Sequence, residues 1–454
     1  MEIPNSRYAF AFHIVFRLRT PLLLLTGDGD EILDDTIDKT PDGKKLHING
    51  YVWASLLRRS LMRIKKGEHL AQQIGKYGPR QGVSPLWCEA SFVDLTGLDS
   101  RPGIMIDRKW GAATTGALYN EETVPPGIQI PLQFTWFVPE DETDQDTFLR
   151  MLMDSISSAL WLINDGIENI GGGWSYGYGR LLFESGQVMV LDLSRSEDRK
   201  RLFAPVSDGQ PLALPKSSPK KSLPWKKISL QFKITDGQLL AVHTKSPLLD
   251  ADFLGDELPD TFVFRSYVFD HQQNRIIPAF VIPGKAIRQG LFSLEIERRL
   301  RTRKETICFG TEQGRQSGAL SCQCKRCKWF GSTSKSGIIA VLDALVELPD
   351  SKNALPSTVI HRIQLCEHSG QNINLFAEEY LTEARFTTDV IIDQSRQNSE
   401  HGELMEYIDA ILSEMKSGGA PPGWYRIGAT ATCTGQIELS EGPSGPAKEV
   451  AYGN

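Results

Sequence analysis

The stretch Ile170-Gly171-Gly172-Gly173-Trp174-Ser175-Tyr176-Gly177-Tyr178-Gly179-Arg180 has a reduced counterpart near the C-terminal end, Ile427-Gly428-Ala429-Thr430-Ala431-Thr432-Cys433-Thr434-Gly435-Gln436. An amphipathic helix is predicted before each stretch, over Phe148–Leu162 and Leu404–Met415. Glycines at this density let the backbone approach a phosphate, and the aromatic residues offer stacking faces. A tight turn between a helix and a strand explains glycine density equally simply, and on that ground alone we favour the turn. The stretch is not a Walker loop, because no Gly-Lys-Ser/Thr follows.

Other landmarks also occur twice, in the same order. His47-Ile48-Asn49-Gly50 precedes an arginine-bearing helix over Trp53–Leu61, as Val281-Ile282-Pro283-Gly284 precedes Ala286–Leu291, and Leu118–Glu122 is echoed by Leu375–Glu379. Leu118 to Leu375 and Ile170 to Ile427 are both 257 residues apart, whereas Ile48 to Ile282 is 234 residues. The sequence therefore predicts two copies of one unit, with 23 residues gained early in the second copy.

A proline-rich segment separates the copies. We predict a first domain over residues 1–204, a linker over 205–225 and a second domain over 226–454. Tyr8–Leu18 and Ile228–Ile234 alternate apolar and polar residues as strands do. The order of strand, helix, strands, helix and strand predicts an α+β class, two tandem ferredoxin-like or RRM-like domains, whose exposed sheet face suits single-stranded RNA.

Charge gives two opposite indications. The chain has 50 Lys+Arg and 56 Asp+Glu, a formal net charge of −6, which taken as an average argues against a nucleic-acid binder. The segment Lys285–Lys328, however, holds 11 basic and 4 acidic residues. A solvated surface is the usual explanation of such a run, and contact with a phosphate backbone is the alternative that we prefer here.

Four of the seven cysteines are close in sequence. Cys308, Cys322, Cys324 and Cys327 lie in an insertion over residues 298–330 of the second domain. Four thiolates can close a tetrahedral zinc site, and a closed site is structural rather than catalytic. The clustering also favours a reducing compartment over a disulfide framework. With no long apolar run and no basic N-terminal region before an apolar stretch, we expect a cytoplasmic protein that does not enter a membrane.

Seven carboxylates lie within the fifteen residues Asp28–Asp42, against the single Lys39. They could be simply solvated, which on the sequence alone is the better explanation. They could also supply an acid–base residue, or ligands for Mg²⁺ or another divalent ion, beside an RNA phosphate.

Together these landmarks resemble the RAMP (repeat-associated mysterious protein) superfamily of CRISPR effector backbone subunits. The Ile-Pro-Gly turn before a helix of that family is matched at Ile282–Leu291 and loosely at Ile48–Arg58, its Ile-Asp-Arg segment at Ile106–Arg108, and its glycine-rich loop closely at Ile170–Arg180. The tandem arrangement is most similar to the double backbone subunit of type III-D variant complexes. The second copy departs from the pattern, since Gln364 stands where the first copy has Asp107.

The resemblance implies that each copy holds guide RNA (crRNA) beside other effector subunits in a filament and contacts the target RNA paired with it. The residues implied in RNA contact are Arg58, Arg59, Gly171, Gly172, Gly173, Tyr176, Gly177, Gly179, Arg180, Lys285, Arg288 and Gly428. It also implies a β-hairpin thumb in each copy, over Met105–Ile130 and Arg362–Phe386, that wedges into the guide–target duplex. The candidate wedge residues are Leu118, Tyr119, Leu375 and Phe376.

In active members a loop aspartate before the Ile-Pro-Gly turn cleaves target RNA, which implies Asp34, with Asp35 and Asp38 as the next candidates. In the second copy the nearest acid is the distant Asp260, with Asp270 closer to the turn but in a different context, so we expect one cleavage centre, in the first copy. Three alternatives stay open: a purely structural backbone subunit, a free-standing endoribonuclease that processes repeat RNA, and a zinc-ribbon interaction protein that binds no RNA. The endoribonuclease is weaker, because no histidine lies between His69 and His243.

Overall fold

The computed structural model describes residues 6–26, 36–64, 67–74, 84–95, 97–107, 112–138, 144–202, 204, 209–215, 225–244, 259–270, 275–308, 322, 324–331, 336–347, 357–365, 369, 371–394, 401–417, 425–428 and 435–440. The chain forms two compact units. The first comprises Met1–Arg101, Asn120–Trp174 and Tyr178–Pro224, and the second comprises Pro102–Tyr119, Ser175–Gly177 and Trp225–Asn454.

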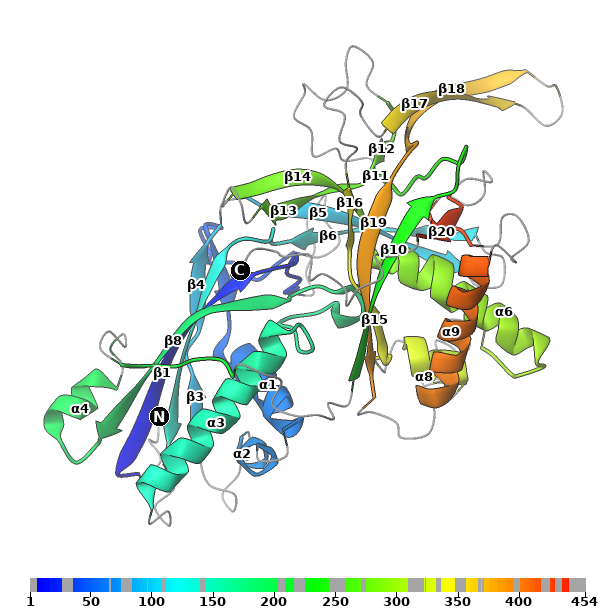
Figure 1. Ribbon diagram of the computed structural model, residues 1–454. Coiled ribbons are helices and arrows are strands. Elements are labelled where there is room, and N and C mark those ends of the chain that lie inside the picture. The colour runs from blue at the N-terminus through cyan, green and yellow to red at the C-terminus, as the bar shows by residue number, and fades with distance from the viewer. Residues whose placement is uncertain are drawn as a thin grey trace. The chain divides into compact units, whose positions relative to one another are not determined.

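The first unit is built on an antiparallel sheet with the strand order β3-β7-β1-β8-β9 (Figure 1). Helix α1 follows β1 and α3 follows β7, so the chain order is that of a ferredoxin-like βαββαβ fold. Its elements are β1 (Tyr8–Leu18), β2 (Lys45–Ile48), α1 (Gly50–Met62), α2 (Glu68–Gln73), β3 (Leu86–Cys88), β4 (Ser91–Asp94), β7 (Gln129–Phe137), α3 (Gln145–Asn164), β8 (Leu181–Asp192), α4 (Ser196–Arg201) and β9 (Gln210–Pro211).

The alternation of β1 determines which face of this sheet the helices cover. The rings of Phe10 and Phe148 stack at 6.4 Å between centroids, and those of Phe16 and Trp53 stack at 6.1 Å, which joins β1 to α3 and to α1. Between them Phe12 stacks on Phe134 of β7 at 4.4 Å. Large apolar residues at every second position thus form one continuous core layer under both helices.

The second unit is built on a sheet with the order β13-β14-β16-β19-β10-β20, with β15 also paired to β19. Helices α6, α8 and α9 lie on one face of it (Figure 1). Its elements are β10 (Trp225–Ile234), β11 (His243–Thr244), β12 (Phe262–Val263), β13 (Arg265–Asp270), β14 (Arg275–Ile282), α5 (Gly284–Ala286), the π-helix η3 (Ile287–Ser293), α6 (Leu294–Thr302), α8 (Lys325–Phe330), β15 (Ile339–Val341), β16 (Ala344–Glu347), β17 (Ser357–Leu365), β18 (Asn372–Leu381), β19 (Arg385–Asp393), α9 (His401–Ser417) and β20 (Ile437–Leu439).

The two sheets share a register. Phe16 of β1 pairs with Ile130 of β7, and Phe232 of β10 pairs with Phe386 of β19 in the same way. Strands β7 and β19 have the same succession of exposed and buried residues over all nine positions. Two hairpins stand outside these sheets as separate antiparallel pairs, β5 (Asp99–Asp107) with β6 (Ala112–Thr123), and β17 with β18.

The predicted α+β class is confirmed, and the strands of both main sheets pair antiparallel. Helices α3 and α9 include the two predicted amphipathic helices. Two details differ from the expectation. Part of the segment expected to be a linker, Gln210–Pro211, pairs with β8, and the helix expected after Pro283 is mostly π-helical. Within the described residues, no helix is long and apolar enough to cross a membrane.

Candidate nucleic-acid interface and metal centre

The glycine loop of the first unit is attached at two points to the segment that follows β1. The Gly172 amide donates to the Leu23 carbonyl at 2.8 Å, and the Gly179 amide donates to the Pro21 carbonyl at 2.8 Å. Gly171 has φ +74°, and a Cβ there would lie 2.3 Å from the Leu23 carbonyl oxygen. Glycine is therefore required at this attachment by both backbone conformation and space.

The second unit has similar backbone contacts between its glycine-poor stretch Ile427–Gln436 and the segment that follows β10. The Gly435 amide donates to the Leu239 carbonyl at 2.6 Å. Gly428 has φ +78°, and a Cβ there would lie 1.9 Å from the Ala241 carbonyl oxygen. Gly428 and Gly435 are the two glycines of this stretch, and both contact the backbone of Leu239–Ala241. Both positions therefore have a backbone role.

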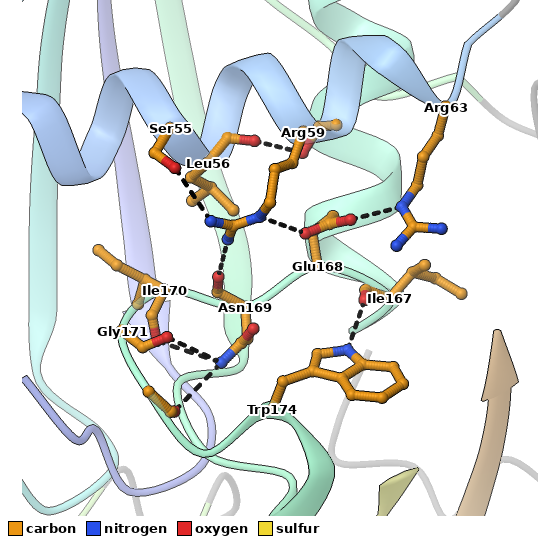
Figure 2. A network of polar contacts seen from close by, with 12 residues as sticks. Ser55, Leu56, Arg59, Arg63, Ile167, Glu168, Asn169, Ile170, Gly171 and Trp174 are labelled. Carbon is orange, nitrogen blue, oxygen red and sulfur yellow. Dashed lines mark hydrogen bonds and ion pairs between the residues drawn. The ribbon is translucent and has the colours of Figure 1, made fainter. Parts of the chain in front are cut away.

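Polar side chains hold the first loop from inside (Figure 2). The buried Asn169 side chain donates to the Tyr178 carbonyl at 3.0 Å and to the Gly172 carbonyl at 3.3 Å. The carboxylate of Glu168, which is also buried, accepts from Arg59 of α1 at 3.0 Å and from Arg63, the residue that follows α1. Arg59 also donates to the Asn169 carbonyl at 2.8 Å. Helix α1 and the glycine loop are thus fastened together by one charged network.

The other predicted RNA-binding cations of the first unit have different surroundings. Arg58 is exposed, and its Nε donates to the Ala71 carbonyl at 3.4 Å. Arg180 is buried, and its amide donates to the Thr20 hydroxyl at 3.0 Å. Arg58 and the half-exposed Arg59 are therefore the solvent-accessible cations of this set, although Arg59 is already paired with Glu168. For Arg58, Arg59 and Arg180 alike, a role in RNA contact stays a prediction.

Lys285 and Arg288 belong to the second unit and face aromatic rings there. The Lys285 ammonium donates to the Tyr119 hydroxyl and lies 5.4 Å from the Tyr176 ring centroid, within cation–π range. Arg288 is buried, and its guanidinium donates to the carbonyls of Ile339 and Phe330. As placed, Arg288 stabilises the protein interior, so its contact with RNA also stays a prediction.

The arginine run of α6 is largely neutralised by acidic residues. Arg298 and Arg299 both pair with Glu295, and Arg301 pairs with Glu297 at 2.8 Å. The hydrogen bonds that Arg298 donates to the Glu295 carboxylate raise the pKa of Arg298. These pairs lie three or four residues apart on one helix, the spacing at which side chains meet. The interpretation of this run as a bare cationic surface is therefore weaker than its composition indicates.

The four cysteines of the insertion meet at one point. Their sulfur atoms all lie within 4.8 Å of one another, with Cys308 Sγ 3.2 Å from Cys327 Sγ and 3.8 Å from Cys324 Sγ. Zn–S bonds of about 2.3 Å in a tetrahedron place sulfurs about 3.8 Å apart. The cluster, completed by Cys322, fits the predicted structural zinc site in number, chemistry and spacing.

The start of α8 positions this cluster. Cys324 precedes the helix and Cys327 lies in its first turn, while Trp329 and Phe330 at the end of α8 are buried in the core of the second unit. Burial raises the pKa of the Cys327 thiol. A bound cation would stabilise the thiolate that burial disfavours, which is the form that ligates a metal.

The hairpin β17–β18 carries two exposed apolar side chains opposite each other. Ile363 and Leu375 are cross-strand partners and are 58% and 57% exposed. Phe376, the other predicted wedge residue here, is half-buried. In the hairpin β5–β6, Tyr119 is half-buried, and the side chain of Leu118 lies outside the described residues. The sequence prediction missed Ile363, whose position opposite Leu375 only the strand register gives.

A glutamate at the base of each hairpin is held in the same way. Glu122 of β6 accepts from the Ile37 amide at 3.1 Å and pairs with Lys39 at 2.8 Å. Glu379 of β18 accepts from the Val263 amide at 2.9 Å and pairs with Arg265. In each unit the cation stands two residues after the amide donor.

The structure describes some of the aspartates that were predicted to cleave RNA. Asp34 and Asp35 lie outside the described residues. Asp38 is half-exposed, with Oδ2 3.1 Å from Nδ1 of His47. Asp260 accepts from the Ala377 amide at 2.7 Å through its side chain and donates its own amide to the Ala377 carbonyl, so it fastens the base of β18.

Two comparisons with known proteins bear on this arrangement. Residues 16–184 match the family model of the RAMP superfamily, a span that runs from β1 to β8 and includes α1, the first hairpin and the glycine loop. No curated protein matches the chain. The family match supports the resemblance that the sequence motifs indicated, for the part of the chain over which it extends.

Proposed function

We propose that the protein is a guide-RNA-binding backbone subunit of a type III CRISPR effector complex, and that it spaces the guide–target duplex and cleaves target RNA from its first domain. The observation that carries this proposal is the RAMP match over residues 16–184. In type III-D variant complexes the related subunit is double, and we propose the same tandem form here. Other effector subunits would lie side by side with it in a filament.

The tandem form is supported by contacts that recur in the second unit. The attachments of Gly171 and Gly179 recur at Gly428 and Gly435, and the carboxylate of Glu122 has its counterpart in Glu379. Each recurrence joins elements distant in sequence. A chance resemblance of short apolar-glycine motifs gives no reason for such coincidences, whereas duplication of one domain explains them all.

In this proposal RNA lies along α1 and the glycine loop. Arg58 and Arg59 contribute positive charge there, and a phosphate contact of this kind positions the strand without reading its sequence. The exposed Ile363 and Leu375 form the apolar wedge of the second thumb. A wedge of this kind pushes one nucleotide out of the stack at a cost of a few kcal/mol per step.

Cleavage is assigned to Asp34, with Asp35 and Asp38 next. At a nucleotide flipped out of the duplex the 2′-hydroxyl can lie in line with its own phosphate, and a carboxylate there takes its proton. Mg²⁺ or another divalent ion, if held by these carboxylates, would stabilise the developing negative charge. The four-cysteine cluster would hold structural Zn²⁺ and take no part in this step.

The test uses the full-length chain purified with its partner subunits. We expect RNA of guide length to co-purify and a target matching that RNA to be cut into a ladder. Asp34→Ala should abolish the cuts of the first domain and leave the bound RNA unchanged, whereas Asp28→Ala, from the same acidic segment, should cut normally. Absence of co-purifying RNA would refute guide binding. An unchanged ladder in Asp34→Ala would move the assignment to Asp35 or Asp38, and an uncut target would leave a structural subunit.

A further inference from the structure

Three strand segments of the first unit form a small surface next to α1. Strand β2 pairs with β4, with His47 opposite Phe92, and Lys39 bridges to Leu46 on the other side of β2. Leu46 and Ile48 of β2 are buried. Alternation therefore turns His47 to the opposite, outer face, where Asp38 and Phe92 are its lateral neighbours.

The imidazole of His47 is held on both sides. Nδ1 lies 3.1 Å from Asp38 Oδ2, and because an ionised carboxylate can only accept, Nδ1 carries the proton of this hydrogen bond. The ring stacks on Phe92 at 5.1 Å between centroids and 17° between planes. Nε2 has no hydrogen-bond partner among the residues that the structure describes. The ring is thus fixed in orientation, with one nitrogen left for a ligand.

The position is accessible. The side chains of His47 and Asp38 are 27% and 42% exposed, and Phe92 is 54% exposed. A partly exposed histidine oriented by a carboxylate is the arrangement that proton transfer requires, and an exposed aromatic ring beside it offers a stacking face for a nucleobase. The ordinary explanation is a cross-strand pair on a solvated face, and the experiment below separates the two.

We propose that His47 is the general acid of the RNA cleavage step, with Asp38 as its positioning residue. This inference rests on the proposed function. The 2′-oxygen bonds to the adjacent phosphorus as its proton passes to the general base, and the bond from phosphorus to the 5′-oxygen breaks. The imidazolium gives its Nε2 proton to that 5′-oxygen while Nδ1–H stays bonded to Asp38. The products are a 2′,3′-cyclic phosphate and a 5′-hydroxyl.

The inference changes the role of Asp38. As a direct catalyst it would have to release its partner, whereas here its bond to His47 is what makes it useful. Asp38→Asn should therefore be less damaging than His47→Ala, since an amide oxygen can still accept from Nδ1 but stabilises the imidazolium less.

The experiment measures cleavage of two matched target RNAs by the assembled complex. One is ordinary RNA, and the other has sulfur in place of the 5′-bridging oxygen, a leaving group that needs no proton. His47→Ala and His47→Gln should slow cleavage of the oxygen substrate by about 10²- to 10⁴-fold and leave the sulfur substrate within a few-fold of the unsubstituted complex. His69→Ala, at an exposed histidine of α2, is the matched control and should cleave both normally.

The outcomes distinguish failure of the role of His47 from failure of the proposed cleaving function. Equal losses on both substrates would mean that His47 is only structural, and no loss on either would mean that it is dispensable; both results overturn the inference and leave target cleavage standing. An unsubstituted complex that retains guide RNA but cuts neither substrate would refute the cleaving function and this inference with it. Slow cleavage of the oxygen substrate with near-normal cleavage of the sulfur substrate by the His47 variants supports the inference.

Discussion

The buried ion pair at the base of hairpin β17–β18 allows a quantitative prediction. Glu379 is fully buried and accepts four hydrogen bonds, from Ser357, from the Val263 amide and, at 2.9 and 2.7 Å, from the two terminal nitrogens of Arg265. Arg265→Met removes the only charged donor of this set and leaves a buried carboxylate with two neutral donors. Removal of one partner of a buried pair costs about 3–5 kcal/mol.

The assay is hydrogen-exchange mass spectrometry on the full chain, which follows each unit separately. A loss of this size corresponds to a fall in amide protection at the base of β18 by about two to three and a half orders of magnitude. Peptides of β7 in the first unit should exchange as before. The double variant Arg265→Met/Glu379→Gln should recover to within about 1–2 kcal/mol, because no uncompensated charge then remains.

The first unit supplies the matched control. Lys39→Met removes the equivalent cation from Glu122, but the Lys39 side chain is 25% exposed. Water can reach this pair, so the expected loss is about 1–3 kcal/mol. The reasoning would be refuted by an Arg265→Met variant that loses less than about 1 kcal/mol, or by a double variant as unstable as the single one.

Three further predictions concern the metal centre, the glycine loop and the second hairpin. Cys327→Ser should lower bound zinc from one ion per chain to a small fraction of that in elemental analysis, whereas Cys88→Ser, in β3, should retain it; equal zinc in both would remove the assignment. Gly171→Ala should cost about 1–3 kcal/mol in a denaturant titration because its φ is positive and its Cβ position is occupied, while Gly172→Ala should stay within about 0.5 kcal/mol. Leu375→Ser should also change the stability by less than about 0.5 kcal/mol, since the side chain is exposed, yet remove the periodic reactivity of target nucleotides to chemical probes near the second hairpin. An unchanged probing pattern would argue against a wedge at this position.

Elements defined by periodicity were predictable from the sequence. Helices α3 and α9 repeat apolar residues at helical spacing and contain the predicted ranges, and the alternation of β1 gives its buried face. The π-helix η3 was not predictable, because its apolar pattern also fits an ordinary helix. The ion pairs of Glu122 and Glu379 at the base of the hairpins were not predictable either. Glu379 and Arg265 are 114 residues apart and meet only through strand pairing, which leaves no local pattern.

The charged residues of α6 show that amino-acid composition alone does not give the charge of a surface. The arginine run of α6 counts as strongly basic, but Glu295 and Glu297 precede Arg299 and Arg301 by four residues. This spacing was present in the sequence and indicates pairing within the helix. The net charge of the whole segment does not reveal this pairing. The converse holds for His47, which has no charged neighbour in the sequence within one residue and acquires Asp38 only across the sheet.

The buried glutamates at the base of the two hairpins, Glu122 and Glu379, hold each hairpin to its unit. A two-stranded sheet in water is marginally stable. Hairpin β17–β18 extends away from the body of its unit (Figure 1), and its Ile363 and Leu375 side chains are exposed. For the proposed wedge function, the hairpin must nevertheless keep its direction when it parts stacked bases. Glu379 ties β18 to the Val263 amide, to Arg265 and to Ser357 at the point where the hairpin leaves the unit. Arg265→Met weakens the hold on Glu379 but leaves the proposed wedge residues unchanged, and it should therefore still impair nucleotide displacement. It should give the same chemical-probing pattern of the target RNA as Leu375→Ser, through a different cause. Only Arg265→Met should alter hydrogen exchange at the base of the hairpin.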